Sequence, residues 1–299
     1  MTGLLVARWL SAMRFLSLQS HVAYGYVGNR AATFPLQRLG HEVWAVNTVE
    51  FSNHTGYGAW RGRAASAEQV GEIVQGIEAL GQFARCDGLL TGYVGDAALA
   101  NVILDTARRV RAANPRALWC CDPVLGDIDT GIYVKPGIDA FFREQAIPAA
   151  DLVTPNHFEL EHLTGRRIST MDEALSAART LLGGPLGGPK LALVTSLRRA
   201  DAPADMIEMV AVTPDAAWRV ATPLIGFEIA PNGTGDAVAA LFTAHWIADS
   251  DVSHALGKAA SSIFAVLEAT QAMGERELQL VAAQERLVAP PRCFTAEKL

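Results

Sequence analysis

The sequence has few cysteines and no pattern of cysteines that could hold a structural metal. There are four cysteines in 299 residues, and none of them forms a CxxC pair, which argues against a zinc site of the usual spacing. Cys120 and Cys121 are adjacent within an apolar run, as is typical of small buried hydrophobic residues in a reducing compartment. We therefore expect a cytoplasmic protein.

Basic clusters and membrane-length apolar runs are missing as well. Charged residues make up 19% of the chain, the net charge is −6, and no run of Lys and Arg stands out, so a nucleic-acid partner is not expected. No apolar run is long enough to span a membrane, which argues against a membrane partner. The first twelve residues precede a second methionine, Met13; Arg8 interrupts their apolar run and no cleavage pattern follows, so a signal peptide is not expected. We predict a leader of uncertain order at residues 1–12 and one domain at residues 13–299.

Strand and helix signals alternate through this domain without an intervening linker. Predicted strands cover residues 14–19, 41–47, 88–91, 117–121, 151–154 and 191–195, and an antiparallel pair covers 205–213 and 216–222. Predicted helices cover residues 29–39, 66–83 (capped by Ser66), 96–113 (capped by Asp96), 171–182, segments opening at 136 and 155, and three stretches from 234 to about 288. Residues 48–63 and 123–134 are predicted loops, the first a functional loop or flap. This pattern predicts a single doubly wound α/β domain, with a mainly parallel central sheet flanked by helices.

A glycine-bearing loop, PNGTGDA at residues 231–237, runs directly into an apolar predicted helix. The amides of Gly233, Thr234 and Gly235 would lie at the helix N-terminus, where free N–H groups and the helix dipole favour an anion. Asp236 adds a carboxylate beside that anion site. A base next to an anion hole suits phosphoryl transfer, because the carboxylate takes the proton of an attacking hydroxyl. The alternative is a simple turn in which Asp236 caps the helix by accepting from first-turn amides.

Further polar residues fall at the carboxyl ends of the predicted strands, where doubly wound sheets bind ligands. These residues are Ser20, the segment 48–55, Tyr93, Asp122, Thr154 and Thr195. Asp122 ends a wholly apolar strand and precedes a proline, so a purely structural role explains it poorly. We predict that one crevice collects these side chains and the 231–237 loop.

Several motifs in a fixed order carry a family resemblance over residues 13–299. They are QSH at 19–21, NTVEFSNHT at 47–55, TGY at 91–93, CDPVLGD at 121–127, TPN followed by Glu159 at 154–159, TS at 195–196 and GTGD at 233–236. In this combination the sequence resembles the pyridoxal kinases of the ribokinase-like superfamily, and their bacterial branch in particular. Thr195 and Gly56 depart from the residues usual in that family, at positions concerned with nucleotide contacts and flap closure.

The resemblance implies ATP-dependent phosphorylation of the 5′-hydroxyl of pyridoxal, giving pyridoxal 5′-phosphate. Asp236 would be the base, with Gly233, Thr234 and Gly235 as the anion hole. The pyridoxal pocket would comprise Ser20, Val27, Thr55, Gly56 and Tyr93 together with Asp236. The nucleotide side would comprise Asp122, Asp127, Tyr133, Thr154, Asn156, Glu159, Thr195, Ser196, Thr222, Pro223, Leu224 and Ile225, with Gly233 and Thr234. Asp122 and Glu159 would act on Mg²⁺, directly or through water. The resemblance also implies a homodimer, and it leaves open a monovalent cation that the residues do not identify.

Two other functions remain open at this stage. A kinase of the same fold could act on hydroxymethylpyrimidine or a sugar, and a non-catalytic protein could bind vitamin B6. Asp236 argues against mere binding, which needs no base beside an anion hole. Two motif-like segments are better explained as structure: GGPLGGPK at 183–190 fails the phosphate-loop pattern, and His157, Glu161 and His162 lack the HExxH spacing.

Overall fold

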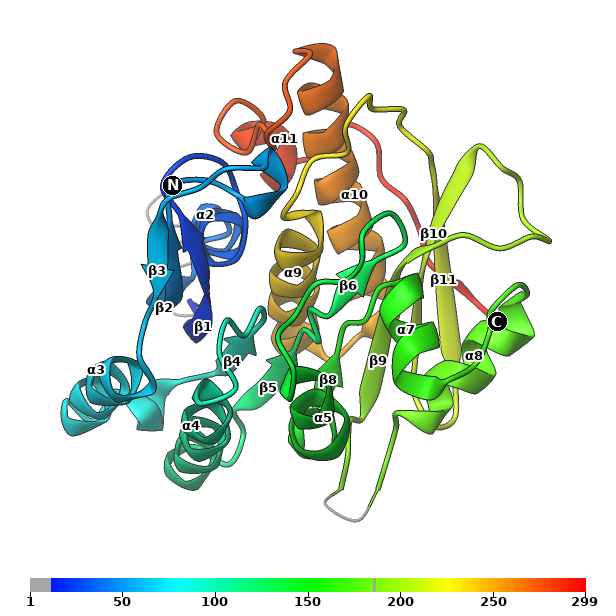
Figure 1. Ribbon diagram of the computed structural model, residues 1–299. Helices are drawn as coiled ribbons and strands as arrows, with labels where there is room; N and C mark the ends of the chain where they lie inside the picture. Colours follow the sequence, from blue (N-terminus) through cyan, green and yellow to red (C-terminus); the bar gives the residue numbers. More distant parts are fainter. Residues whose placement is uncertain (1–11, 185–186) are drawn as a thin grey trace, which may run out of the picture.

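The computed structural model describes residues 12–184 and 187–299, and it shows a central sheet between two layers of helices (Figure 1). The predicted leader therefore lies outside the described residues, apart from Ala12. The sheet has ten strands in the order β12-β11-β10-β9-β8-β5-β4-β1-β2-β3. The strands are β1 (Arg14–Val22), β2 (Glu42–Phe51), β3 (Gly62–Ala64), β4 (Gly88–Thr91), β5 (Leu118–Cys121), β8 (Leu152–Val153), β9 (Leu191–Leu197), β10 (Met206–Val212), β11 (Ala217–Pro223) and β12 (Glu297–Lys298).

The six strands from β2 to β9 in the sheet order pair in parallel, while β3 at one edge and β10, β11 and β12 at the other are antiparallel. The first strand, β1, is the third from one edge; the chain passes from it to β2 and β3 on one side and then crosses to β4 on the other. Connections therefore leave β1 and β4 in opposite directions, and such a switch point opens a crevice at the carboxyl ends of the strands. The predicted doubly wound, mainly parallel sheet is confirmed.

Helices cover both faces of the sheet because its central strands carry apolar side chains on both sides. Within β5, Trp119 and Cys121 belong to one buried cluster and Cys120 to the other, as the alternation of side chains along a strand requires. One face is covered by α2 (Asn29–Arg38), α9 (Thr234–Asp249), α10 (Val252–Ala272) and α11 (Gln284–Val288). The other face is covered by α3 (Ala67–Ala79), α4 (Leu99–Ala113), α5 (Ile138–Phe141), α7 (His157–Thr164) and α8 (Met171–Thr180); a π-helical turn (Phe142–Ala146) and α6 (Ile147–Ala149) follow α5. None of the helices in the described ranges is both long and apolar enough to cross a membrane.

The two predicted loops contain more regular structure than the sequence indicated. In the first, β2 continues to Phe51 because it stays paired with β1, and β3 returns antiparallel to it. Only residues 52–61 lie outside the strands, and we call these residues the flap; they include a 3₁₀ turn (Thr55–Tyr57). In the second, β6 (Gly126–Asp127) and β7 (Gly131–Ile132) form a small hairpin. Both loop predictions were wrong in this respect, because short strands follow from pairing with distant partners and not from local pattern.

Two helix predictions also needed correction at their ends. The helix capped by Ser66 stops at Ala79, since Gly81 adopts a left-handed conformation (φ 71°), and a separate 3₁₀ turn (Gln82–Arg85) follows. Helix α4 begins at Leu99 with Ala98 as its N-cap residue, so Asp96 does not cap it. Instead, Asp96 forms a turn before the helix by accepting a hydrogen bond of 3.0 Å from the amide of Ala98.

Candidate active site

The site begins at the N-terminus of α9, which starts where the sequence predicted. Gly233 is the N-cap residue, with a φ of 82°, and a Cβ atom there would lie 1.8 Å from the carbonyl oxygen of Tyr26. Only glycine is compatible with both constraints. The chain therefore passes close to the segment after β1, which brings residues more than 200 positions apart into contact.

Asp236 lies in the first turn of α9 and does not cap it. Helix α9 has no side-chain cap hydrogen bond; the Oδ2 atom of Asp236 instead accepts a 2.9 Å hydrogen bond from the amide of Gly28. The alternative interpretation, in which Asp236 serves only to cap its own helix, is therefore wrong. The contact aims the carboxylate away from its own helix and toward residues 23–28, which connect β1 to α2 and which we call the base loop.

The base loop carries one residue predicted to bind pyridoxal, Val27, and packs against another, Ser20 of β1. Val27 is buried, and Gly28 (φ 53°) packs so tightly on Ser20 that a Cβ atom would lie 2.4 Å from the Ser20 hydroxyl oxygen. Ser20 itself is 7% exposed. Ser20, Gly28 and Asp236 therefore converge on one point, between the end of β1 and the start of α9.

Partial burial makes Asp236 a stronger base than an exposed carboxylate. Desolvation raises its pKa to about 6, while the hydrogen bond from Gly28 acts in the opposite direction by favouring the ionised form. A carboxyl group with this pKa is largely ionised at neutral pH and still accepts a proton more readily than an ordinary aspartate.

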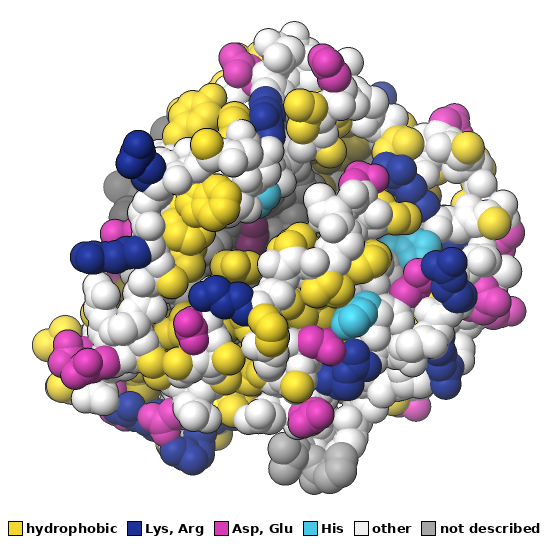
Figure 2. All heavy atoms as spheres, viewed as in Figure 1, with side chains coloured by type: hydrophobic (Ala, Val, Ile, Leu, Met, Phe, Trp, Pro, Cys, Tyr) yellow, Lys and Arg dark blue, Asp and Glu magenta, His cyan; other side chains and the backbone are white. Residues whose placement is uncertain are grey.

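A second acidic group lies at the carboxyl ends of β5 and β8. Asp122 is 7% exposed and accepts a 2.8 Å hydrogen bond from the hydroxyl of Thr154. Its pKa is raised well above the ordinary value, first by burial and then by the charges of Glu159 and Asp236. The three carboxylates are therefore close enough to repel one another. Figure 2 shows a hollow near the centre of this face, bordered by apolar side chains, with acidic atoms visible inside it.

Glu159 is fixed by the start of α7. It forms a reciprocal capping box with Asn156: the Asn156 side chain accepts from the amide of Glu159 at 2.8 Å, and the Glu159 side chain accepts from the amide of Asn156 at 2.8 Å. The amide of Leu125 donates to the same carboxylate at 2.9 Å. Burial raises its pKa to about 8, although these backbone hydrogen bonds oppose the shift. Asn156 also donates to the carbonyl oxygen of Gly126 at 3.0 Å, which ties the hairpin to α7.

The carboxylate oxygens of Asp122 and Glu159 form a donor set that fits a divalent cation. Asp122 and Glu159 are buried carboxylates whose ionisation is opposed by burial, and a bound cation would favour the ionised forms. Within residues 12–184 and 187–299, no three His, Cys, Asp or Glu side chains converge closely enough to hold a metal by themselves. Mg²⁺ commonly binds through one or two carboxylates together with substrate phosphates and water, and this arrangement meets that requirement.

The remaining residues of the predicted nucleotide side lie near these carboxylates or on neighbouring strands. Asp127 is exposed on β6. Tyr133 follows β7 and is about half exposed. Its pKa is raised first by partial desolvation and then by the charges of Glu159, Asp236 and other carboxylates. Thr195 is buried on β9 and forms a bridge with Asn156. Next to it, Ser196 has a φ of 51°, a left-handed conformation that is uncommon for a residue other than glycine and is often found at functional sites.

Three further groups of predicted residues have their hydrogen-bond partners outside the group of carboxylates. Tyr93 follows β4, and its carbonyl oxygen accepts from the hydroxyl of Thr48 at 3.3 Å. Thr55 and Gly56 are exposed in the flap, where their hydrogen bonds go to Gly58, His54 and Arg276. The segment 222–225 comprises the last two residues of β11 and the two that follow it. Thr222 is buried, Pro223, Leu224 and Ile225 are partly exposed, and Leu224 donates to the carbonyl oxygen of Asp205.

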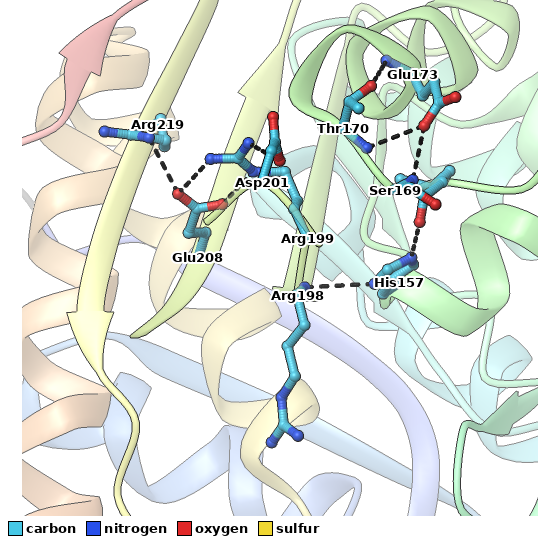
Figure 3. Close-up of polar contacts among 10 residues, drawn as sticks. His157, Ser169, Thr170, Glu173, Arg198, Arg199, Asp201, Glu208 and Arg219 are labelled. Atoms are coloured by element: carbon cyan, nitrogen blue, oxygen red, sulfur yellow. Dashed lines mark hydrogen bonds and ion pairs between the residues drawn. The ribbon is translucent and has the colours of Figure 1, made fainter. Parts of the chain in front are cut away.

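The two histidines suspected of forming a metal helix have structural partners, and Figure 3 shows the contact of His157 with Arg198. His157 accepts from the amide of Arg198 at 3.3 Å and contacts the carbonyl oxygen of Ile168 at 3.2 Å, while His162 pairs with Asp139. On the neighbouring strands, the buried carboxylate of Glu208 binds Arg199 at 2.6 Å and Arg219 at 3.1 Å. These contacts hold β9, β10 and α7 together and occupy the imidazoles of His157 and His162.

Sequence reasoning missed two residues that the structure places at the site. Gly28 supplies the amide that holds Asp236, and Glu277, 5% exposed, accepts from the amide of Tyr26 at 3.0 Å. The only local signal was the run of glycines and aromatics at residues 24–28, which marks a loop without indicating its partner.

Comparisons with known proteins agree with this geometry. Residues 62–280 match the phosphomethylpyrimidine kinase family. The pyridoxal kinase PdxY of Rubrobacter xylanophilus is 55% identical over 288 residues, covering 96% of this chain and 98% of that protein. Its counterpart in Deinococcus radiodurans is 50% identical over 286 residues, covering 95% and 96%. Among solved structures, the pyridoxal kinase from Leishmania donovani in complex with ADP and ginkgotoxin superposes with a TM-score of 0.87 at 30% identity, covering 96% of this chain and 99% of that chain.

The fold and the grouping of carboxylates beside a helix N-terminus define a small-molecule kinase of the ribokinase-like type. The full-length similarity narrows this class, and the chain belongs to the pyridoxal kinase family. The family resemblance predicted from the ordered motifs is confirmed.

Proposed function

We propose that this protein transfers the terminal phosphate of ATP to the 5′-hydroxymethyl group of pyridoxal, giving pyridoxal 5′-phosphate. The observation that carries the proposal is the position of Asp236, which is held by the Gly28 amide beside Ser20 at the start of α9. The relatives named pyridoxal kinase PdxY support the substrate, as do the Leishmania donovani structures in complex with ADP and pyridoxine or pyridoxamine.

In this proposal the chain's own residues divide the work between proton transfer and charge stabilisation. An alcohol is almost un-ionised at neutral pH, and Asp236 accepts its proton as the oxygen attacks phosphorus. The amides of residues 233–235 stabilise the charge that develops on the transferred phosphoryl group. Ser20 and Val27 line the pyridoxal side, with Thr55, Gly56 and Tyr93 at its rim. Asp122, Asp127, Tyr133, Thr154, Asn156, Glu159, Thr195, Ser196 and residues 222–225 form the ATP side.

We further propose that Asp122 and Glu159 hold Mg²⁺ together with the nucleotide. The ion supplies neutralisation of the phosphate charges, which the chain does not provide through a phosphate-loop lysine. Thr154 and the amides around Glu159 keep the two carboxylates oriented for this task.

Purified protein with Mg-ATP, assayed on pyridoxal, pyridoxine, pyridoxamine, hydroxymethylpyrimidine and ribose, tests the substrate. We expect kcat/KM to be highest for one of the three B6 vitamers. The match to the phosphomethylpyrimidine kinase family makes hydroxymethylpyrimidine the second candidate. Turnover of that alcohol without turnover of any vitamer would overturn the proposal, and tight binding of pyridoxal without turnover would favour a B6-binding protein.

The remaining proposals concern organisation. We propose one kinase domain over residues 13–299, a homodimer as the family resemblance implies, and a cytoplasmic location. Cys86, Cys120, Cys121 and Cys293 are all free thiols, which supports a reducing compartment. Light scattering on the purified protein tests the dimer.

A further inference from the structure

Glu277 is a buried carboxylate with two separate partners and no part in the chemistry described above. It follows α10 and is 5% exposed. One oxygen, Oε1, accepts a hydrogen bond from the hydroxyl of Tyr57 at 2.7 Å, and the other, Oε2, accepts from the amide of Tyr26 at 3.0 Å. Tyr57 belongs to the flap and Tyr26 to the base loop, so a single side chain connects these two segments.

The contact with the base loop is tight. Gly25 has a φ of 93°, and a Cβ atom there would lie 2.3 Å from Oε2 of Glu277. The same loop also contacts the start of α9. The carbonyl oxygen of Tyr26 packs against Gly233, and the amide of Gly28 donates to Asp236. Glu277 therefore supports the loop that aims the base.

The contact with the flap is reinforced by the neighbouring residue. The guanidinium of Arg276 lies over the ring of Tyr57, with its carbon 3.7 Å from the ring centroid, and it donates to the carbonyl oxygen of Gly56 at 2.9 Å. A cation over an aromatic face is attractive, and a hydrogen bond to a carboxylate is stronger than one between neutral groups. The turn that carries Thr55 and Gly56 is thereby held against residues 276 and 277.

We propose that Glu277 is a positioning residue that couples closure of the flap over pyridoxal to the placement of Asp236. This inference rests on the proposed function. The two contacts of Glu277 have separable effects. The contact with Tyr57 governs the affinity for pyridoxal, and the contact with Tyr26 governs the position of the Asp236 carboxylate.

Steady-state kinetics of Tyr57→Phe, Glu277→Gln and Glu277→Ala separate the two effects. Tyr57→Phe removes only the flap contact, so we expect KM for pyridoxal to rise about tenfold while kcat stays within about twofold and KM for ATP is unchanged. Glu277→Ala removes both contacts; we expect a similar rise in KM and, in addition, a fall in kcat of about tenfold or more. Glu277→Gln can still accept from Tyr26 while its amide donates to the Tyr57 oxygen, so its parameters should lie between those of Glu277→Ala and wild type.

The pH profile distinguishes positioning from loss of stability. Loosening the base loop weakens the Gly28 hydrogen bond, which favours ionised Asp236. The acid limb of kcat/KM should therefore move to higher pH in Glu277→Ala and, to a smaller extent, in Glu277→Gln. It should not move in Tyr57→Phe. Glu285→Ala is the matched control, because Glu285 is an exposed carboxylate on α11 that pairs with Arg38; its kinetics should equal those of wild type.

The outcomes also separate this inference from the proposed function. If wild type phosphorylates pyridoxal and the folded Tyr57→Phe and Glu277→Gln variants match it in KM, kcat and pH profile, the coupling is refuted while the function stands. If wild type instead phosphorylates a different alcohol, the function fails, and the same variants assayed on that alcohol still decide the coupling. Should Glu277→Ala fail to fold, Tyr57→Phe and Glu277→Gln decide it alone.

Discussion

Replacing Asp236 with Asn tests the proposed chemistry most directly. The amide keeps the size of the carboxylate, and its oxygen can still accept from Gly28, so ATP and pyridoxal should bind as before. The proton acceptor is lost. General-base catalysis is typically worth about 10²–10⁴-fold in rate, and we expect kcat to fall by that factor, which corresponds to about 3–5 kcal/mol of barrier.

The pH profile should change together with the rate. With the pKa of Asp236 raised to about 6, wild-type kcat/KM should rise with pH through that value and level off above it. The variant, measured in the same buffers, should lack this inflection, and it also corrects for any ionisation of the substrate.

The same substitution should stabilise the fold at neutral pH. A carboxyl whose folded pKa lies above the ordinary 3.8 destabilises the folded state as the pH rises from about 4 to about 6, because the unfolded state loses its proton first. At about 1.36 kcal/mol for each unit by which the pKa is raised, the unfolding free energies of the variant and the wild type differ by at most about 3 kcal/mol. Partial exposure of Asp236 reduces this difference to about 1–3 kcal/mol. Thermal unfolding should therefore show a higher Tm for Asp236→Asn at pH 7 and nearly equal values at pH 4.

Asp249→Asn is the control, since Asp249 lies at the other end of α9 and pairs with His254. A variant at position 236 that keeps more than a tenth of wild-type kcat, or that retains the inflection near pH 6, would refute the assignment of Asp236 as the base.

Three further predictions follow from the geometry around this carboxylate. Gly233→Ala places a methyl group against the Tyr26 carbonyl at a positive φ, so we expect a loss of about 1–3 kcal/mol in unfolding free energy and a fall in kcat; an unchanged Tm would contradict the close approach. Thr154→Val removes a hydrogen bond that favours ionised Asp122, so the acid limb of kcat/KM for Mg-ATP should move to higher pH, and a profile identical to wild type would show that Asp122 is not involved. Glu159→Gln should raise the Mg²⁺ concentration needed for half-maximal activity by about tenfold, measured by titrating Mg²⁺ into chelator-treated protein; an unchanged titration would remove Glu159 from the metal site.

The sequence was sufficient for the layers of the fold and for the family, while the roles of the individual site residues remain predictions. Apolar runs such as residues 117–121 predict central parallel strands because both of their faces are covered, and the GTGD segment predicts an anion site at a helix start because its amides have no partner within the helix. These features are local, and local patterns can be read directly.

The supporting contacts could not be predicted because they join distant parts of the chain. Asp236 and Gly28 are 208 residues apart, and Glu277 is 251 residues from Tyr26. Nothing in the sequence around Glu277 distinguishes it from the exposed Glu275 two residues earlier, and only packing shows which of the two is buried. The hairpin β6–β7 was missed for a related reason: each strand has two residues, too few to show alternation.

Residues 297–299 cover one edge of the sheet. Glu297 and Lys298 of β12 pair with Arg219 and Trp218 of β11, Leu299 donates to the carbonyl oxygen of Ala217, and Glu297 forms an ion pair with Arg219. Without this short strand, β11 would present unpaired amides and carbonyls, which recruit strands from other molecules. Deletion of residues 297–299 would therefore expose this part of β11 and promote aggregation.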